Sequence, residues 1–203
     1  MKAYPTISRK IQNTKAYVFD KLDGSNIRVE WTVKNGFNKF GSRKRLLGTD
    51  QEIIVEAYDL LDDKYQSELK SVFVKQRWQK VTCFFEFWGE NSFAGFHENE
   101  EHKLTLIDVN PYKSGIMNPD EFVKLFGHMS IAKLLYIGNV NQDIVNQVRN
   151  STFEGMTDEG VVCKIKTVRK QLSPVMFKIK SNAWLKRLKE YCKGDEKMYE
   201  RLM

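Results

Sequence analysis

The sequence predicts an α+β fold in which helices flank an antiparallel sheet. Short apolar or alternating runs, typical of strands, recur along the chain and are separated by polar turn residues. One longer stretch, residues 51–76, instead places apolar residues at three- and four-residue steps, which is the period of a helix. A chain of 203 residues with 41% apolar content is long enough for one medium-sized domain with its own core.

The chain is expected to open with a β-meander. Residues 16–19 are apolar and predict a short buried strand, and residues 27–33 alternate between apolar and polar side chains. Asn35 and Gly36 form a strong signal for a two-residue hairpin turn. Residues 37–42 are therefore predicted to return as the next strand.

A long amphipathic helix over residues 51–76 follows, with an interruption expected near Asp62 and Asp63. The apolar segments at 81–88 and 104–109 predict two core strands on either side of a polar loop. The elements expected after them are helices at 119–126 and 143–149, strands at 160–166 and 175–180, and a basic helix from about residue 183 to the end. Asn118 is the predicted N-cap of the first of these helices.

Positive charge is concentrated in the last part of the sequence. The chain carries a net charge of +7, yet residues 1–160 hold 21 basic and 22 acidic side chains while residues 161–203 hold 12 and 4. Such a local field favours a polyanionic partner, either nucleic acid or the phosphates of a nucleotide. A solvated, lysine-rich helix would explain the same charge equally well.

Composition and motifs exclude several function classes. Three widely spaced cysteines, Cys83, Cys163 and Cys192, with no Cys-x-x-Cys pair, argue against a disulfide framework and a structural zinc site. The three histidines lack ligand spacing, and the common Gly-rich nucleotide loops and His-Glu-x-x-His are absent from the sequence. No apolar run approaches a membrane span and no secretory signal is evident, so we expect a cytoplasmic protein.

The segment KLDGSN at 21–26 has two interpretations. Asp23 and Gly24 form a favoured turn pair, so the segment can simply connect two strands. Alternatively, Lys21 is a covalent nucleophile, which requires a pKa lowered by burial or by neighbouring positive charge because only an unprotonated amine attacks. In that case Gly24 would let the backbone approach a bulky nucleotide.

Three later segments help to decide between these interpretations. Glu86 lies within an aromatic strand, where an unpaired carboxylate is costly unless it has a hydrogen-bonding role. Glu159 precedes a β-branched strand. Lys178 and Lys180 share one strand face and would repel each other unless an anion lies between them. Each feature alone is also compatible with a sheet edge or a solvent-facing strand.

Taken together, these segments resemble the motifs of the covalent nucleotidyltransferase superfamily of ligases and capping enzymes, most closely the phage-type RNA ligases. The matching segments, in family order, are KLDGSN at 21–26, SRK at 42–44, FFEFWGE at 84–90, EGVV at 159–162 and KIK at 178–180. Order and spacing match over residues 15–181. The resemblance implies an antiparallel-sheet, ATP-grasp-like ligase adenylation domain over residues 1–181, followed by a basic C-terminal helix over residues 182–203.

The resemblance also implies catalytic roles. Lys21 would attack the α-phosphate of ATP, expel pyrophosphate and hold AMP as a phosphoramidate. Lys178 and Lys180 would bind that phosphate and neutralise the charge that grows on its oxygens. Glu159 would hold a divalent ion or the attacking lysine, and Mg²⁺ is the expected ion because a triphosphate carries more charge than two lysines offset.

Further residues are expected to bind the nucleotide. Glu86 would accept a hydrogen bond from the ribose, and Arg43 would contact the nucleotide or the acceptor end. Asp20 favours adenine because a carboxylate accepts from its amino group but repels the carbonyl oxygen of guanine; a turn-capping role for Asp20 is an equal alternative. The remaining candidates for the nucleotide pocket are Asp23, Gly24, Asn26, Ile107 and Val162.

The sequence departs from the family pattern in two places. Ile107 precedes Asp108 where the family has an aromatic ring, so aliphatic packing, with Val162 on the opposite face of the base, would replace stacking. Only 23 residues follow Lys180, which leaves no separate oligonucleotide-binding domain. The basic residues expected to contact a nucleic-acid backbone instead, unless an accessory nucleic-acid-binding protein does so, are Lys186, Arg187, Lys189 and Lys193.

The function that follows from the resemblance is a minimal ATP-dependent RNA ligase. It would transfer AMP from Lys21 to a 5′-phosphate and then join that end to a 3′-hydroxyl. Asn26 favours RNA, since DNA ligases and capping enzymes usually carry arginine there. The alternatives are a DNA ligase, a capping guanylyltransferase, and a non-catalytic basic module that binds RNA ends. Stand-alone ligases of this pattern are frequent in phages, so the compartment would then be the host cytoplasm, with a role in nucleic-acid repair.

Overall fold

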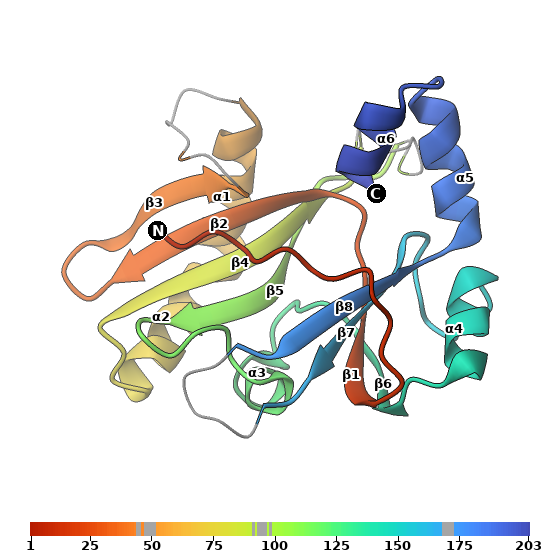
Figure 1. The fold of residues 1–203 in the computed structure, drawn as a ribbon. Coiled ribbons are helices and arrows are strands. Elements are labelled where there is room, and N and C mark those ends of the chain that lie inside the picture. Colours follow the sequence, from red (N-terminus) through yellow and green to blue (C-terminus); the bar gives the residue numbers. More distant parts are fainter. Residues whose placement is uncertain (44–45, 47–51, 91, 93–96, 98, 168–172) are drawn as a thin grey trace.

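The structure is a computed structural model that describes residues 1–43, 46, 52–90, 92, 97, 99–167 and 173–203. These residues form two four-stranded antiparallel sheets with helices on their outer faces (Figure 1). The α+β class with flanking helices is thus confirmed, although the strands form two sheets where the sequence predicted one. Among the described residues, no helix is both long and apolar enough to cross a membrane.

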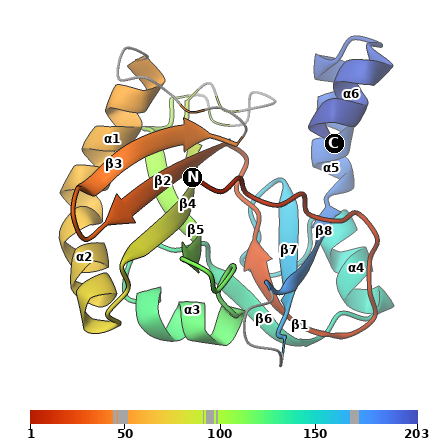
Figure 2. The same cartoon turned by 60° about the vertical axis from the view of Figure 1, so that its left-hand side comes forward.

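The first sheet carries the N-terminal strand and the last strands of the chain. Its order is β6-β1-β7-β8, with β6 at Leu134–Asn139, β1 at Lys15–Asp20, β7 at Gly160–Ile165 and β8 at Val175–Lys180. Helix α4, Gln142–Arg149, covers this sheet and buries Val145 and Val148 against it (Figure 2). The contact closes a small apolar core that is separate from the larger one described next.

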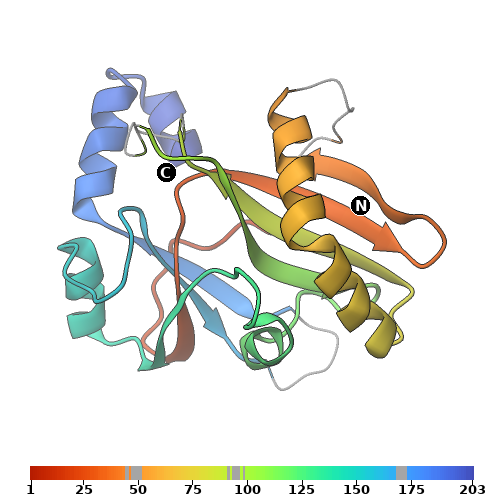
Figure 3. The same ribbon diagram turned by 180° about the vertical axis from the view of Figure 1, so that it is seen from behind.

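The second sheet carries the larger hydrophobic core. Its order is β3-β2-β4-β5, with β3 at Gly36–Ser42, β2 at Ser25–Thr32, β4 at Lys80–Trp88 and β5 at Lys103–Pro111. Helices α1, Glu52–Lys64, and α2, Gln66–Lys75, cross its outer face (Figure 3). Leu61 and Phe73 are fully buried there, and the Phe73 ring lies 5.2 Å from that of Trp31 on β2. Helix α3, Pro119–Phe126, adds two further buried phenylalanines to this core.

Several predicted boundaries differ from the structure. The interruption of the long helix predicted near Asp62 and Asp63 is found at Tyr65, between α1 and α2. The buried Tyr65 hydroxyl lies 2.6 and 2.8 Å from the carbonyl oxygens of Leu104 and Ser130. Gln51, where that helix was predicted to begin, lies outside the described residues, as does Lys44 of the SRK segment. Strand β6 was not predicted.

The basic C-terminal helix is in fact two helices. Helix α5 covers Asn182–Tyr191 and α6 covers Glu196–Leu202, and they pack against each other. The chain reverses between them at Lys193 and Gly194, whose φ angles are 47° and 88°. Asn118 does occupy the N-cap position of α3, but its side chain instead exchanges hydrogen bonds with the backbone of Thr167.

The junction between the sheets lies within the KLDGSN segment. Strand β1 ends at Asp20 in the first sheet and β2 begins at Ser25 in the second, so residues 21–24 pass from one sheet to the other. The two sheets present their inner faces to this crossing (Figure 1). Side chains that project from the crossing can therefore meet side chains from either sheet.

Candidate active site

A cavity of about 900 Å³ opens between the two sheets. This volume is in the range of pockets that enclose a ligand of nucleotide size. All the site residues predicted from the sequence line it, namely Asp20, Lys21, Asp23, Gly24, Asn26, Arg43, Glu86, Ile107, Glu159, Val162, Lys178 and Lys180. The structure thus brings together residues that are up to 160 positions apart in the chain.

Backbone pairing fixes Lys21 beside Glu159. Residues 161–164 of β7 pair with the end of β1, and the Lys21 backbone N–H donates to the carbonyl of Gly160 at 3.0 Å. Gly160 has a φ of +135°, and a Cβ there would lie 2.1 Å from the carbonyl oxygen of Ile179. Only glycine allows β7 and β8 to approach this closely, which explains why glycine follows Glu159.

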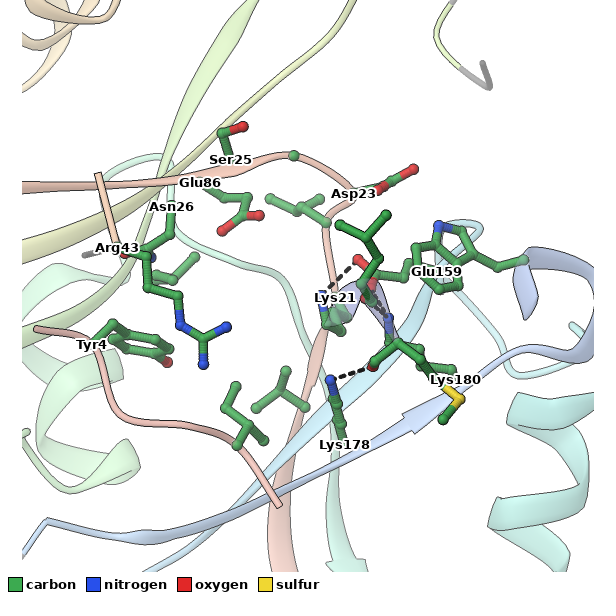
Figure 4. A pocket seen from close by; sticks show the side chains of 18 of the residues that line it. Tyr4, Lys21, Asp23, Ser25, Asn26, Arg43, Glu86, Glu159, Lys178 and Lys180 are labelled. Atoms are coloured by element: carbon green, nitrogen blue, oxygen red, sulfur yellow. Dashed lines mark hydrogen bonds and ion pairs between the residues drawn. The ribbon is translucent and has the colours of Figure 1, made fainter. Parts of the chain in front are cut away.

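Glu159 bridges two lysines. The Lys21 Nζ lies 2.6 Å from Glu159 Oε2, and the Lys180 Nζ lies 2.9 Å from Glu159 Oε1 (Figure 4). The Glu159 side chain is only 4% exposed, so its charge is balanced by these two ammonium groups inside the protein. A single carboxylate thus holds the predicted nucleophile next to one of the predicted phosphate-binding residues.

The expected lowering of the Lys21 pKa is not found. Burial lowers the pKa of Lys21, but the negative charge of Glu159 and the hydrogen bond to it raise the pKa, and the net result is a pKa above the ordinary value. The same pairing lowers the pKa of Glu159. In this structure Lys21 is therefore a protonated amine, held in place by its counterion.

Lys178 and Lys180 behave in the opposite way. Burial, the neighbouring Lys180 charge and Lys21 lower the pKa of Lys178 to about 7. Burial, opposed by Glu159, lowers the pKa of Lys180 to about 8. At neutral pH the neutral form of Lys178 is therefore well populated while Lys180 is mostly charged, and an anion beside them would favour the charged form of both. That an anion lies between them stays a prediction.

Two further carboxyl groups face the same cavity. Burial and the charge of Glu159 raise the pKa of Asp23 to about 7, and a hydrogen bond from the Trp184 side chain partly offsets this. Burial raises the pKa of Glu86 to about 8. Glu86 is therefore largely protonated at neutral pH and can donate a hydrogen bond as well as accept the one expected from a ribose.

The donor set is compatible with a divalent ion that is shared with a nucleotide. Within the described part of the chain, no three His, Cys, Asp or Glu side chains converge closely enough to hold a metal ion alone. Mg²⁺ characteristically binds one or two carboxylates and completes its coordination with substrate phosphates and water. Glu159, with Asp23 beside it, fits that pattern.

The start of β2 explains two further predicted residues. A Cβ on Gly24 would lie 2.3 Å from the carbonyl oxygen of Phe87, so this glycine allows close approach to β4. That Gly24, which lines the cavity, also leaves room for a nucleotide stays a prediction. Asn26 pairs with Glu86 across β2 and β4, and its buried Oδ1 has no hydrogen-bond partner among the described residues. It lines the cavity as an available acceptor.

Asp20 and Arg43 already have protein partners. Asp20 Oδ1 accepts from the backbone N–H and the hydroxyl of Thr157, at 2.8 and 3.0 Å. This contact matches the capping alternative for Asp20, which also lines the cavity. Arg43 lies at the opposite wall from the lysines and donates to the Thr6 hydroxyl at 3.3 Å (Figure 4).

A buried ion pair between Lys164 and Asp108 lies next to an apolar part of the cavity. Ile107 and Val162 line this part. Beneath them, Lys164 Nζ lies 2.7 Å from Asp108 Oδ1, and the Tyr4 hydroxyl donates to Asp108 Oδ2 at 2.5 Å. Asp108 therefore has a structural role, with both oxygens occupied by protein groups.

Two parts of the site were not predicted from the sequence. The N-terminal segment crosses the cavity and contributes Tyr4, Thr6 and Arg9. The end of α6 covers the lysines, since Lys178 donates to the carbonyl of Met203 at 2.6 Å and Lys180 to that of Leu202 at 3.4 Å. Neither segment carries a motif, and the only signal that could have indicated them is the charge of the C-terminal region.

The fold is shared with solved RNA ligases. No family model matches the sequence, and no curated protein is similar to it at the sequence level. The RNA ligase of Naegleria gruberi with pyrophosphate is 18% identical, with a TM-score of 0.65, over 88% of this chain and 53% of that one. A mutant of the same ligase with ATP and Mn is 18% identical, with a TM-score of 0.63, over 91% and 59%.

A third structure, a mutant of that ligase with AMP and Mn, is 17% identical, with a TM-score of 0.63, over 86% and 52% of the two chains. The present chain thus spans a little over half of the length of these ligase structures. The resemblance to this superfamily that the sequence motifs indicated is confirmed at the level of the fold.

Proposed function

We propose that the protein is an ATP-dependent RNA ligase whose first step is the formation of lysyl-AMP on Lys21. The observation that carries this proposal is the Lys21–Glu159–Lys180 arrangement, in which one buried carboxylate contacts both ammonium groups within 3 Å. An amine, a paired acidic group and a second cation in one nucleotide-sized cavity are the parts that covalent nucleotidyl transfer requires.

The reaction begins with the amine of Lys21. The Lys21 Nζ–P bond forms while the bond between the α-phosphorus and the bridging oxygen breaks, and pyrophosphate leaves with that electron pair. Lys21 must first lose a proton, which Glu159 is placed to accept at 2.6 Å. A divalent ion at Glu159 and Asp23 would supply positive charge that favours the neutral amine and offsets the charge of the triphosphate.

The other residues of the cavity would orient the nucleotide. Lys178 and Lys180 would contact the α-phosphate, and the neutral fraction of each side chain, which is larger for Lys178, would take up a proton when an anion arrives. Glu86 and the unpaired Oδ1 of Asn26 would bind ribose or base polar groups. Ile107 would provide an apolar surface for the base.

The comparisons support the choice of ligand. The Naegleria gruberi ligase structures contain pyrophosphate, ATP or AMP, and those with a nucleotide also contain Mn. We infer that this chain uses ATP with a divalent ion, Mg²⁺ under cellular conditions. The nucleic acid would be RNA with a 5′-phosphate and a 3′-hydroxyl, contacted in part by the exposed lysines of α5, Lys186 and Lys189.

A labelling experiment tests the proposal. The protein is incubated with Mg²⁺ and α-labelled ATP or GTP, denatured and examined for label on the chain. We expect acid-labile label from ATP only, and none on Lys21→Ala. Persistent labelling of Lys21→Ala would reject this nucleophile, and no label from either nucleotide would favour a non-catalytic RNA-end-binding module. Nicked duplexes with RNA or DNA on each side then identify the polynucleotide, and sealing confined to all-DNA nicks would favour the DNA ligase alternative.

A further inference from the structure

Trp184 on α5 lies beside two residues of the candidate site, although no role in the reaction has been assigned to it. Its side chain is buried, and the Lys180 Nζ lies 3.6 Å from the centroid of its ring. The same side chain is close enough to Asp23 to lower the pKa of that carboxyl group. Trp184 thus neighbours both the KLDGSN segment and the Lys-x-Lys strand.

The backbone around Trp184 is fixed relative to Glu159. Ser181 caps α5. Its hydroxyl accepts from the backbone N–H of Trp184 at 3.1 Å and donates to the Asp158 carbonyl at 2.6 Å. The Ser181 backbone N–H donates to the carbonyl of Glu159 at 3.0 Å. The indole ring is therefore held in register with the carboxylate that pairs with Lys180.

A lysine side chain has four rotatable bonds, so its ammonium needs external contacts to stay in one place. The Lys180 ammonium has three contacts, namely Glu159 Oε1 at 2.9 Å, the face of Trp184 and the Leu202 carbonyl at 3.4 Å. A divalent ion at Glu159, as proposed above, would compete for the first contact, and a triphosphate would compete with the Leu202 carbonyl. The aromatic face would then be the contact that remains.

We propose that Trp184 is a positioning residue, whose ring holds the Lys180 ammonium toward the α-phosphate. This inference rests on the proposed lysyl-AMP reaction and adds a specific requirement to it. An aromatic ring at position 184 should affect the rate of the chemical step more than the binding of ATP, since Lys180 neutralises charge that grows in the transition state.

The test compares Trp184→Phe with Trp184→Leu in the single-turnover labelling of Lys21 over a range of ATP concentrations. A desolvated cation–π contact is worth about 30-fold in rate, so we expect Trp184→Leu to lower the maximal rate by about that factor with little change in KM. Trp184→Phe keeps an aromatic face, so we expect the decrease in the logarithm of its maximal rate to be at most half of that in Trp184→Leu. Wild-type rates in Trp184→Leu, or equal losses in both variants, would overturn the proposal.

Leu188→Ala is the matched control for a purely structural effect. Leu188 lies one turn further along α5 and is fully buried in the same cluster, but its side chain does not line the cavity. We expect it to lower the thermal stability while the labelling rate of the folded protein stays normal. An equal loss of rate in Leu188→Ala would overturn the positioning role. Absence of label in the wild type would instead reject the lysyl-AMP reaction itself, so the two failures are distinguishable.

A second observation concerns the end of α6, which occupies the position where an anion is expected. The carbonyls of Leu202 and Met203 accept hydrogen bonds from Lys180 and Lys178. On the other side, the Arg9 guanidinium lies 3.1 Å from Glu200 Oε2 and donates to the Glu200 carbonyl at 2.9 Å. Helix C-termini carry free carbonyls and partial negative charge. They can therefore substitute for phosphate oxygens.

We infer that α6 competes with the triphosphate for Lys178 and Lys180, and that the Arg9–Glu200 pair holds α6 in the competing position. This inference also rests on the proposed use of ATP, but it concerns binding and not the chemical step. Release of α6 would have to precede or accompany nucleotide entry. Loosening its attachment should therefore improve the apparent affinity for ATP.

Arg9→Gln tests this inference through the sign of the effect. Removing a cation from an anion-binding cavity weakens ATP binding by electrostatics alone, whereas releasing α6 strengthens it. We expect the KM for ATP in the labelling reaction to fall by about threefold or more, since the ion pair is solvent-exposed and weak. Glu200→Gln should give a similar fall.

The control is Glu196→Gln, which removes one negative charge from the exposed start of the same helix without touching Arg9. We expect its KM to match that of the wild type. An unchanged or higher KM in Arg9→Gln would overturn the inference, as would an equal fall in Glu196→Gln. Absence of label in the wild type would reject the lysyl-AMP reaction and not this competition, which ATP binding by calorimetry would then test directly.

Discussion

The paired lysines of β8 predict a steep pH dependence of nucleotide binding. The pKa of Lys178 is about 7 and that of Lys180 about 8 in the protein without nucleotide. An anion favours the charged form of both side chains, so each must take up a proton on binding if it is neutral beforehand. Affinity should therefore fall as the pH rises through these pKa values, because the required protons become scarcer.

The magnitude follows from the fraction of protein in which both lysines are already charged. With pKa values of about 7 and 8, this fraction is roughly 0.5 at pH 7.0 and below 0.01 at pH 8.5, so affinity should drop by about 60-fold. The assay is isothermal titration calorimetry with ATP in the presence of EDTA, which prevents lysyl-AMP formation. Above pH 7 the triphosphate is almost fully ionised and contributes little to the change.

Lys178→Arg provides a matched control. Arginine stays charged over the whole range, so only the Lys180 contribution remains and the drop between pH 7.0 and 8.5 should shrink to about fourfold. The wild-type measurement should also show proton uptake as a dependence of the binding enthalpy on the buffer. Affinity that is constant or rises with pH in the wild type would refute the assignment of these two lysines as the anion site.

Three further predictions concern stability and RNA binding. Gly24→Ala should lower the free energy of unfolding in urea by about 1–3 kcal/mol or more, because its Cβ would lie 2.3 Å from the Phe87 carbonyl oxygen; wild-type stability would contradict this contact. Tyr65→Phe should cost about 1–3 kcal/mol in the same assay, since two carbonyls lose their donor. Replacing Lys186 and Lys189 with alanine should reduce the salt dependence of single-stranded RNA binding by roughly 1.4 units of log K per log salt, and an unchanged slope would exclude α5 from the RNA-binding surface.

Local sequence patterns predicted most strands and helices because the corresponding segments have strong intrinsic periodicity. The apolar run at 81–88 and the helical steps after residue 52 need no distant partner to be recognised. Strand β6 lies at a sheet edge, where most of its residues are only half-buried or exposed. It was missed although it begins with the four apolar residues 134–137, because a short apolar run without alternation does not by itself distinguish a strand from other structure. The strand is defined by its antiparallel hydrogen-bonded pairing with β1, which the sequence alone does not show.

The sequence motifs predicted which residues meet in one cavity, but they did not predict the direction of the pKa shift of Lys21. Ordered motifs identified residues that line one cavity, since each motif is a local pattern. The pKa of Lys21 depends instead on Glu159, which lies 138 positions away in the chain. A short sequence motif does not show how close two such distant residues lie in the folded protein. The same holds for Arg9 and for the carbonyls of α6, whose contact with the site exists only in the folded chain.

The distribution of charge in the cavity explains why Lys21 is protonated in the absence of nucleotide. If the Lys21 amine were neutral, Glu159 would keep only Lys180 as a partner in a buried site, at considerable electrostatic cost. Protonated Lys21 stabilises the carboxylate and, in the proposed reaction, would be held in position for attack. Nucleotide and divalent ion together bring the charges that make this pairing unnecessary, so the amine would become reactive only when the substrate is bound. Proton release from the enzyme on binding ATP with Mg²⁺, against proton uptake with ATP alone, is the measurable consequence.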